Sequence, residues 1–357
     1  MHSRSPRLYT SLAACLLAVA LGCAEISPPL PPPIPALVVI DSSHGELRII
    51  PVGAPAAAQV LSIPGGTPTR VGLAARDSIV LLTEAATGEV LVINAAVPSV
   101  LRSFTLPATD GVSGPTIVDD SLAYVALPAI NRLMRLNYLT GDTASVAVGT
   151  TPVVAVSARS RVFAVNANLG ACPPARSACP LGPSWLTVVL PQTNLLPTTG
   201  DSIAMLGPGN ADAAIAAIDG LLYVMNAGDS VSGEGRLSLV DPVAGSERAS
   251  FSGFGFSPGS LASDPQGRVF VASLSEGVMV FDGRARVVIR GAGSGLPVSA
   301  NTGVAADDQG NLYALQSAAC GAAPGTVRVF LPTLIETTGF GAGNCPAVAI
   351  ITDLPGD

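Results

Sequence analysis

Two stretches in the last third of the chain decide its fold: Ser260-Leu-Ala-Ser-Asp-Pro-Gln-Gly-Arg-Val-Phe-Val-Ala-Ser273 and Thr302-Gly-Val-Ala-Ala-Asp-Asp-Gln-Gly-Asn-Leu-Tyr-Ala-Leu315. Each consists of a short apolar strand, a turn that contains Asp and Gly, and a second strand rich in β-branched and aromatic residues. Because the same pattern occurs twice, we looked for further copies along the whole chain.

Looser copies of this pattern extend over most of the sequence. The central residue of the second strand gives seven anchors, separated by roughly 40 to 60 residues: Val38, Val80, Tyr124, Phe163, Tyr223, Phe270 and Tyr313. A third strand follows each anchor, within 46–50, 89–93, 132–136, 184–189, 236–240, 277–281 and 326–330. Units of about 40 to 45 residues with four short strands are typical of propeller blades. The sequence therefore predicts an all-β fold, a seven-bladed β-propeller with four-stranded antiparallel blades.

The residues that carry the pattern most clearly resemble two known families. Asp264-Pro-Gln-Gly-Arg-Val-Phe-Val271 and Asp307-Asp-Gln-Gly-Asn-Leu-Tyr313 are similar to the NHL-repeat and YncE-like propellers. The resemblance covers 36–352 in period, but only these two units are close to the family pattern. It implies the fold alone, since propellers of this kind have many functions.

The two ends of the repeat region complement each other. The first unit begins directly at its second strand, 36–41, and the chain ends on 346–351, which has the pattern of an innermost strand. We therefore expect the C-terminal strand to pair with the N-terminal strands and close the ring, which removes two exposed sheet edges.

The N-terminal segment has the features of an export signal. Residues 1–22 combine a basic start with an apolar run from Leu8 to Leu21, which is shorter than the roughly 20 residues of a membrane-spanning helix. Ala20-Leu-Gly-Cys23 resembles the lipobox of bacterial lipoproteins, although Ala20 stands where Leu is usual. Cys23 is then the lipidated residue, and a plain secretory signal cut near Ala24 is the alternative. By the same resemblance we expect an outer-membrane or cell-surface lipoprotein.

A proline-rich spacer, 23–35, follows the signal, and 36–357 is predicted to be one propeller domain. The chain carries a net charge of −7, with 12% charged residues and no basic patch. This balance excludes nucleic acid as an expected partner and leaves the lipid anchor as the only membrane contact. We expect a monomer.

Four cysteines remain after the signal and the lipidation site: Cys172, Cys179, Cys320 and Cys345. An even number in an exported chain indicates two disulfides. Of the three possible pairings we favour Cys172–Cys179, which closes a small loop, and Cys320–Cys345, because propeller topology places both of these loops on one face. Zinc is the alternative, but the chain beyond the signal has one histidine and no Cys-x-x-Cys spacing.

Candidate ligand-binding residues gather at one predicted face. The long segments 167–183, 227–235 and 317–325 all follow second strands, so they extend from the same side of the ring. Polar residues at strand ends near these loops are the candidates: Asp41, Glu84, Asn166, Asp212, Asn226, Asn301, Gln316 and Asn344. Such residues also make ordinary turns.

Three functions are compatible with this pattern. The first is a non-catalytic envelope lipoprotein that binds a protein or a small polar ligand at the loop face without a cofactor. The second is a lactonase-like hydrolase that holds Ca²⁺ or Zn²⁺ over the central channel with carboxylate and amide oxygens. The third is an adhesive or structural component. No catalytic triad or phosphate-binding loop is recognisable.

Overall fold

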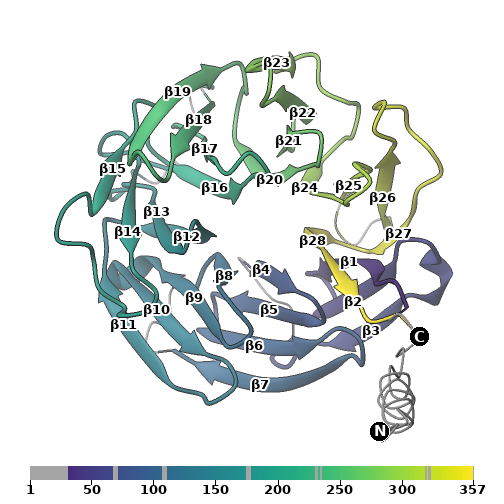
Figure 1. Cartoon of the computed structure of the whole chain (residues 1–357). Coiled ribbons are helices and arrows are strands. Elements are labelled where there is room, and N and C mark those ends of the chain that lie inside the picture. The colour runs from purple at the N-terminus through teal and green to yellow at the C-terminus, as the bar shows by residue number, and fades with distance from the viewer. Residues whose placement is uncertain are drawn as a thin grey trace, which may run out of the picture. The chain divides into compact units, whose positions relative to one another are not determined.

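The computed structural model describes residues 31–66, 71–106, 111–173, 178–229, 232–233, 235–317, 320 and 323–356. Within them, Pro33–Pro355 form one compact unit, a ring of seven four-stranded antiparallel sheets (Figure 1). The described residues contain no α-helix, only the 3₁₀ turns η1 (Pro55–Ala57) and η2 (Pro128–Ile130). The predicted seven-bladed propeller is thus confirmed, whereas the signal peptide, Cys23 and most of the spacer lie outside the described residues.

The blades follow the chain, and each is named here with its strands from the centre outward. Blade 1 contains β28 (Pro346–Leu354), β1 (Ile34–Asp41), β2 (Glu46–Pro51) and β3 (Gln59–Ser62). Blade 2 contains β4 (Val71–Arg76), β5 (Ile79–Glu84), β6 (Glu89–Asn94) and β7 (Ser99–Thr105). Blade 3 contains β8 (Pro115–Ile117), β9 (Leu122–Leu127), β10 (Arg132–Asn137) and β11 (Thr143–Ala147). Blade 4 contains β12 (Pro152–Ala158), β13 (Arg161–Asn166), β14 (Trp185–Val189) and β15 (Ser202–Ala204).

The remaining three blades have the same order. Blade 5 contains β16 (Ala211–Ala216), β17 (Leu222–Asn226), β18 (Arg236–Asp241) and β19 (Ser246–Ser252). Blade 6 contains β20 (Pro258–Ser263), β21 (Arg268–Ser273), β22 (Gly277–Asp282) and β23 (Val287–Arg290). Blade 7 contains β24 (Asn301–Ala306), β25 (Leu312–Gln316), β26 (Gly325–Phe330) and β27 (Phe340–Gly343). All seven anchors lie in second strands.

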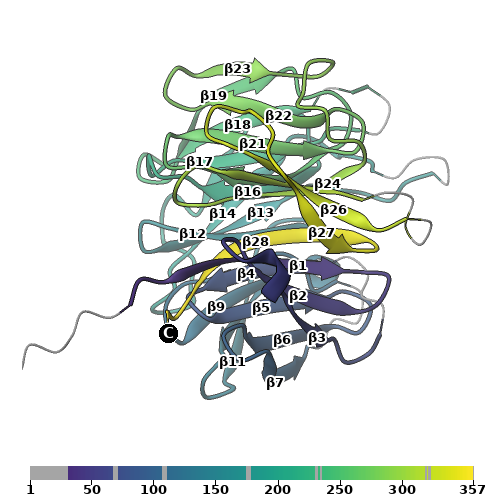
Figure 2. The same cartoon turned by 90° about the vertical axis from the view of Figure 1, so that its right-hand side faces the viewer.

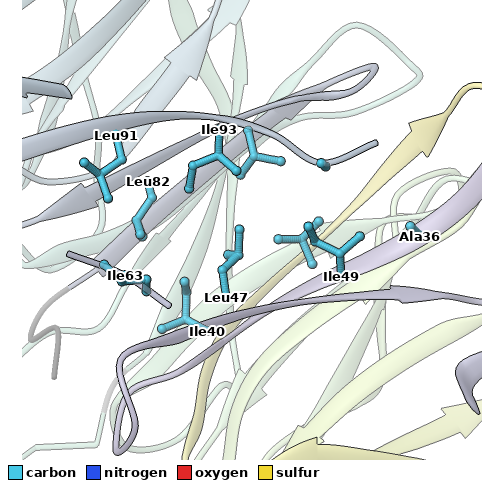
Figure 3. Close-up of a cluster of buried hydrophobic side chains, with 11 residues drawn as sticks. Ala36, Ile40, Leu47, Ile49, Ile63, Leu82, Leu91 and Ile93 are labelled. Atoms are coloured by element: carbon cyan, nitrogen blue, oxygen red, sulfur yellow. The ribbon is translucent and has the colours of Figure 1, made fainter. Parts of the chain in front are cut away.

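The second strands are apolar throughout because both of their faces are buried between blades. In β1, Val38 and Ile40 pack with Leu82 and Ile93 of blade 2 (Figure 3). The alternate residue Val39 joins a separate cluster with blade 7. Successive side chains of a strand point to opposite faces, so a run such as Leu-Val-Val-Ile supplies both interfaces.

The Asp-x-x-Gly turns of blades 6 and 7 explain why their repeat pattern is the clearest. Asp264 Oδ1 accepts the Arg268 N–H at 2.8 Å, and Gly267 has a φ of +84°. In blade 7, Asp307 Oδ1 accepts the Gln309 N–H at 3.0 Å and Gly310 has a φ of +86°. Glycine is favoured at these turn positions because the left-handed region is costly for other residues.

The last strand closes the ring. β28 pairs antiparallel with β1, from Ile34 opposite Leu354 to Asp41 opposite Pro346. Figure 2 shows β28 running beside β1 at the seam between the two ends of the chain. β1 begins two residues before the predicted domain boundary, because β28 continues to Leu354 and gives Ile34 and Pro35 a partner strand. The predicted closure is confirmed.

Two disulfides, Cys172–Cys179 and Cys320–Cys345, join the four predicted cysteines in the favoured pairing. Cys320 follows β25, and Cys345 directly precedes β28, so the second disulfide fixes the start of the closing strand to blade 7. Disulfides of this kind fit a chain that is exported to an oxidising compartment. None of the described residues forms an apolar helix long enough to span a bilayer.

A truncation tests the closure. A chain that ends at Cys345 lacks β28, so it exposes the edge of β1 and the channel side of blade 1. We expect this variant to lose the cooperative thermal unfolding transition of the full chain, measured by circular dichroism. A chain that ends at Leu354 keeps every pairing of β28 and serves as the control. Equal unfolding midpoints for the two variants would contradict the role given to β28.

The two disulfides should differ in their contribution to stability. Cys320→Ala/Cys345→Ala opens the longer loop, with a separation of 25 residues against 7 for Cys172–Cys179. Loop-closure entropy predicts a loss of about 3 to 4 kcal/mol for the first pair and about 2 to 3 kcal/mol for the second. Chemical denaturation of both double variants measures the difference. A larger loss from Cys172→Ala/Cys179→Ala would show that the seam does not depend on Cys345.

Candidate functional site

The seven innermost strands enclose a central channel with a volume of about 1530 Å³. Its described lining consists of Ala, Gly, Val, Leu, Ile and Pro residues with several Ser and Thr hydroxyls, two Asn amides and one carboxylate, and it includes no aromatic residue. Because these inner side chains are short, they leave the centre of the ring open. Each innermost strand pairs with only one other strand of its sheet, so unpaired backbone groups also face the channel.

The innermost strands are irregular at one end of the channel. This end belongs to the loop face, defined here as the side of the ring where the second strands end. The pairing shifts register there in β12, β16, β20, β24 and β28. The residues left without a cross-strand partner are Val153, Asp212, Gly259 with Ser260, Thr302 and Ala347. A β-bulge redirects the side chain of the extra residue, and bulges are frequent beside binding sites.

Asp212 is the only ionisable residue in the described lining of the channel. It follows the first residue of β16 and is the unpaired residue of that strand's bulge. No hydrogen bond or ion pair links its carboxylate to another described residue, and its side chain is accessible to solvent. A carboxylate therefore lies unpartnered near the loop-face end of a mostly apolar channel.

Neighbouring bulge residues use their side chains differently. The Thr302 hydroxyl donates to the Pro346 carbonyl of blade 1 at 2.6 Å, and the Ser260 hydroxyl accepts the Val304 N–H of blade 7 at 3.4 Å. Both hydroxyls thus connect adjacent innermost strands. Asp212 Oδ2 instead approaches Gly259 of blade 6, where a Cβ atom would lie only 3.2 Å from it. Gly259 leaves the space that this carboxylate occupies.

Burial raises the pKa of Asp212 above its usual range. The surrounding channel wall removes part of the hydration of this carboxyl, which disfavours its charged form even though the side chain is open to the channel. No described channel residue carries a positive charge that could counter this effect. The ionised carboxylate is consequently a group for which a bound cation would be a favourable partner.

Asp41 and Asn344 belong to the ring closure. Asp41, the last residue of β1, is fully buried and accepts the backbone N–H groups of Asn344 at 2.8 Å and Cys345 at 3.1 Å. The Ser43 hydroxyl donates to it at 2.8 Å, and His44 Nδ1 lies 3.2 Å from Oδ2. Burial alone would raise the pKa of Asp41, but these hydrogen bonds outweigh it and hold the pKa well below its usual range.

Three other candidates form hydrogen bonds with a turn, a neighbouring backbone or neighbouring side chains. Glu84 accepts the N–H groups of Ala86 at 3.1 Å and Thr87 at 2.6 Å in the turn after β5. Asn301 donates to the Gly277 carbonyl of blade 6 at 3.1 Å and lines the channel entrance. Gln316 donates to Ser299 Oγ at 2.8 Å and accepts from Arg328 at 2.8 Å.

Asn166 and Asn226 occupy equivalent places at the ends of β13 and β17. Their Nδ2 groups donate at 3.0 Å to Thr187 Oγ1 and Ser238 Oγ, respectively, in the third strands. Both amides are buried inside their blades, and their Oδ1 atoms have no hydrogen-bond partner among the described residues. The structure therefore places these two candidates beneath the loop face and away from the channel.

The eight candidates do not converge on one point. Asp41 and Asn344 are joined by a hydrogen bond, and Asp212 and Asn301 belong to the described channel lining. Within the described part of the chain, no group of three or more His, Cys, Asp and Glu residues is arranged to hold a metal ion. The geometry therefore emphasises one of the eight candidates, the carboxylate of Asp212 in the channel.

Sequence reasoning missed Gly259, Ser260 and Thr302 as neighbours of the site. They lie in innermost strands, whose Ala, Gly and Ser residues have no distinctive pattern. The sequence did contain one signal, the single acid within Ala211-Asp-Ala-Ala214. An isolated acid in an apolar strand has no local turn with which it could form hydrogen bonds.

A second hollow lies on the same face beside the Cys172–Cys179 loop. It has a volume of about 450 Å³ and is lined by residues that include Leu181, Pro208 and Asp229. Leu181 is 70% exposed and the nearby Leu206 is 84% exposed. This part of the loop face therefore presents apolar surface to solvent.

Comparisons with known proteins agree on the architecture. No family model matches the chain, and no curated protein matches its sequence. Among solved structures, apo AztD from Citrobacter koseri is similar with a TM-score of 0.59, 11% identity, and 90% of this chain and 98% of that chain covered. A functionally unknown protein from Desulfotomaculum acetoxidans reaches 0.63 at 12% identity, covering 90% and 99%. Hydrazine synthase from Kuenenia stuttgartiensis reaches 0.57 at 12% identity, covering 80% and 92%.

These similarities establish the fold alone. They extend over most of each chain, so the propeller is shared as a whole unit. Any function must be argued from the residues of this chain.

The Asp41 contacts predict an acid-sensitive seam. A carboxyl whose pKa is lowered on folding stabilises the protein above its unfolded pKa of about 3.9, and this stabilisation is lost as the pH falls through the lower folded value. Asp41→Asn turns an NH₂ group toward backbone donors, so we expect a loss of roughly 2 to 4 kcal/mol near pH 7. Urea unfolding across pH measures it.

The exposed carboxylate of Asp308 provides the matched control. Asp308→Asn should leave the unfolding free energy within about 0.5 kcal/mol of the unaltered protein. Equal effects of the two substitutions, or an Asp41→Asn variant as stable as the parent near pH 7, would contradict the assignment.

Proposed function

We propose that this chain is a non-catalytic binding protein that takes a small ligand into its central channel from the loop face. The observation that carries the proposal is the open channel of about 1530 Å³, with one unpartnered carboxylate near its loop-face end. Ligand sites are concave, mostly apolar and equipped with a few polar groups that orient the ligand. This channel has all three properties.

The rigidity of the ring supports this proposal. Every blade contributes an innermost strand to the wall, and β28, the innermost strand of blade 1, pairs with β1 and completes it. A wall built from paired strands keeps the same shape with and without a ligand, so binding does not require much ordering of the protein. The volume exceeds the range of about 300 to 1000 Å³ for usual pockets, so a small ligand would occupy one part of it.

The envelope setting extends the proposal. A propeller anchored through a lipid on Cys23, with the proline-rich segment as spacer, would be tethered through Ile34, the end of β1 opposite the loop face. The exposed Leu181 and Leu206 would give a protein partner an apolar contact at the rim of that face. We also propose that the chain is related to the NHL-repeat or YncE-like propellers, which the repeat pattern of blades 6 and 7 resembles.

The channel can be blocked selectively. In Gly259→Leu, a side chain projects toward Asp212 into the entrance, and the glycine backbone has no positive φ to forbid the change. Gly53 is the matched control, since it is exposed and a Cβ there would meet nothing within 4 Å. The measurement is a ligand-observed NMR screen of cationic, neutral and anionic fragments against both variants and the parent.

We expect fragments that bind the parent and Gly53→Leu but not Gly259→Leu. Thermal unfolding of both variants shows whether the fold is retained. If every binding fragment also binds Gly259→Leu, the channel is not the site and the proposed function is wrong.

A further inference from the structure

We propose that Asp212 selects a monocationic organic ligand, an amine with a small apolar body, which binds near the loop-face end of the channel. This inference rests on the proposed function and specifies its ligand class. Three features of the described structure lead to it: the position of Asp212, the chemistry of the surrounding wall, and the lack of a side chain at Gly259.

The position of Asp212 is not explained by folding. Other carboxylates near the strand ends cap turns or accept backbone N–H groups, as Asp41, Glu84 and Asp264 do here. Asp212 does neither with any described residue. Its equivalent in blade 7, Thr302, bonds to the next innermost strand, and a threonine could do the same in blade 5. A carboxylate at this position is partly desolvated, and no hydrogen bond or ion pair with a described residue compensates for that cost.

The wall around Asp212 limits the charge of the ligand. One carboxylate balances one positive charge, and the described lining offers no second acid. A calcium ion takes six to eight oxygen ligands, commonly from several carboxylates, and Zn²⁺ is usually bound by nitrogen, sulfur and further carboxylate ligands. Neither set is present in the described channel. An ammonium group needs only one carboxylate together with carbonyl or hydroxyl acceptors, and the free edges of the innermost strands supply carbonyls.

The same wall favours an apolar body next to the charge. Ala213, Ala214 and Ile215 continue along β16 from Asp212, and Leu261 and Ala262 lie along β20. Contact with these side chains removes apolar surface of the ligand from water at about 25 cal/mol per Å². The Coulomb attraction between ligand and carboxylate is also stronger here than at the open surface, because protein surrounds the channel.

Gly259 makes the carboxylate accessible. A side chain there would lie against Asp212 Oδ2, at 3.2 Å from its Cβ atom. With glycine in this place, no side chain of β20 covers the carboxylate here, and it stays open to the channel. The carboxylate of blade 5 is therefore accessible because the neighbouring position in blade 6 is a glycine.

The direct test uses three probes with the same four-carbon chain: n-butylammonium, n-butanol and butyrate. Their affinities for the parent, Asp212→Asn and Asp308→Asn are measured by ligand-observed NMR. We expect n-butylammonium to bind the parent most tightly of the three and to lose at least about tenfold in affinity in Asp212→Asn. Asp308→Asn removes an exposed carboxylate outside the channel lining and should bind like the parent.

The pH dependence gives a second readout. The amine stays protonated below about pH 10, so its affinity should fall when Asp212 takes up a proton, at a pH above the usual value for an aspartate. No other described channel residue from any of the seven innermost strands titrates. The decrease should be present in Asp308→Asn and absent in Asp212→Asn.

Stability separates this role from a structural one. Because the folded pKa of Asp212 is raised, its ionised form destabilises the folded protein at pH values above that pKa, and the effect disappears below the unfolded pKa of about 3.9. Asp212→Asn should therefore unfold at the same temperature as the parent or higher near pH 7. A lower midpoint would mean that Asp212 supports the fold, and it would overturn the inference.

The remaining outcomes are distinguishable. If n-butylammonium binds Asp212→Asn as well as the parent, or if none of the three probes binds, the inference is wrong. If n-butanol or butyrate binds and is blocked by Gly259→Leu while n-butylammonium is not bound, the ligand class is wrong but the proposed function stands. If Ca²⁺ binds in a manner that depends on Asp212 and the amine does not bind, the ligand is a metal ion and the inference is wrong.

Discussion

The pairing of β28 with β1 is the interaction on which the rest of the structure depends. A propeller blade buries both of its faces against neighbours, so a ring with one incomplete blade exposes apolar surface on two sides as well as a sheet edge. Here the closing blade takes one strand from the C-terminus and three from the N-terminus. Asp41 fixes the turn before β28, and Cys320–Cys345 ties that turn to blade 7. Charge, covalent bond and strand pairing thus act at one seam.

Closure also determines what the centre of the molecule can do. Once the outer strands form the blade interfaces, the innermost strands are free to carry small side chains, and the channel stays open. The bulges at its loop-face end turn single residues away from the regular pairing. In the other four bulged strands the unpaired residue is apolar, or its hydroxyl bonds to the next blade. Asp212 differs, and a stable ring can tolerate the desolvation of one carboxylate, as functional sites often require.

Much of the fold could be predicted from the sequence, because local patterns determine it. The anchors are apolar on both strand faces, the Asp-x-x-Gly turns require glycine, and the cysteine pairing follows from propeller topology. The candidate site was predicted less well. Asp41 and Asn166 are polar residues at strand ends, as a ligand site would require. Each of them forms hydrogen bonds with a segment that lies well apart in the sequence, and these bonds appear only in the folded structure. A β-bulge and the glycine across from it depend on register between strands, which a single sequence does not show.

Hydrogen exchange at the seam tests the account most directly. If closure holds the ring together, the amides of β28 that bond to β1 should exchange only by global unfolding, with the same opening free energy as the amides of β5 and β17 in the buried second strands. Native-state exchange read by mass spectrometry over a denaturant series measures these values. Exchange of β28 by a separate, low-energy opening, with β5 and β17 still fully protected, would show that the ring does not depend on its closing strand.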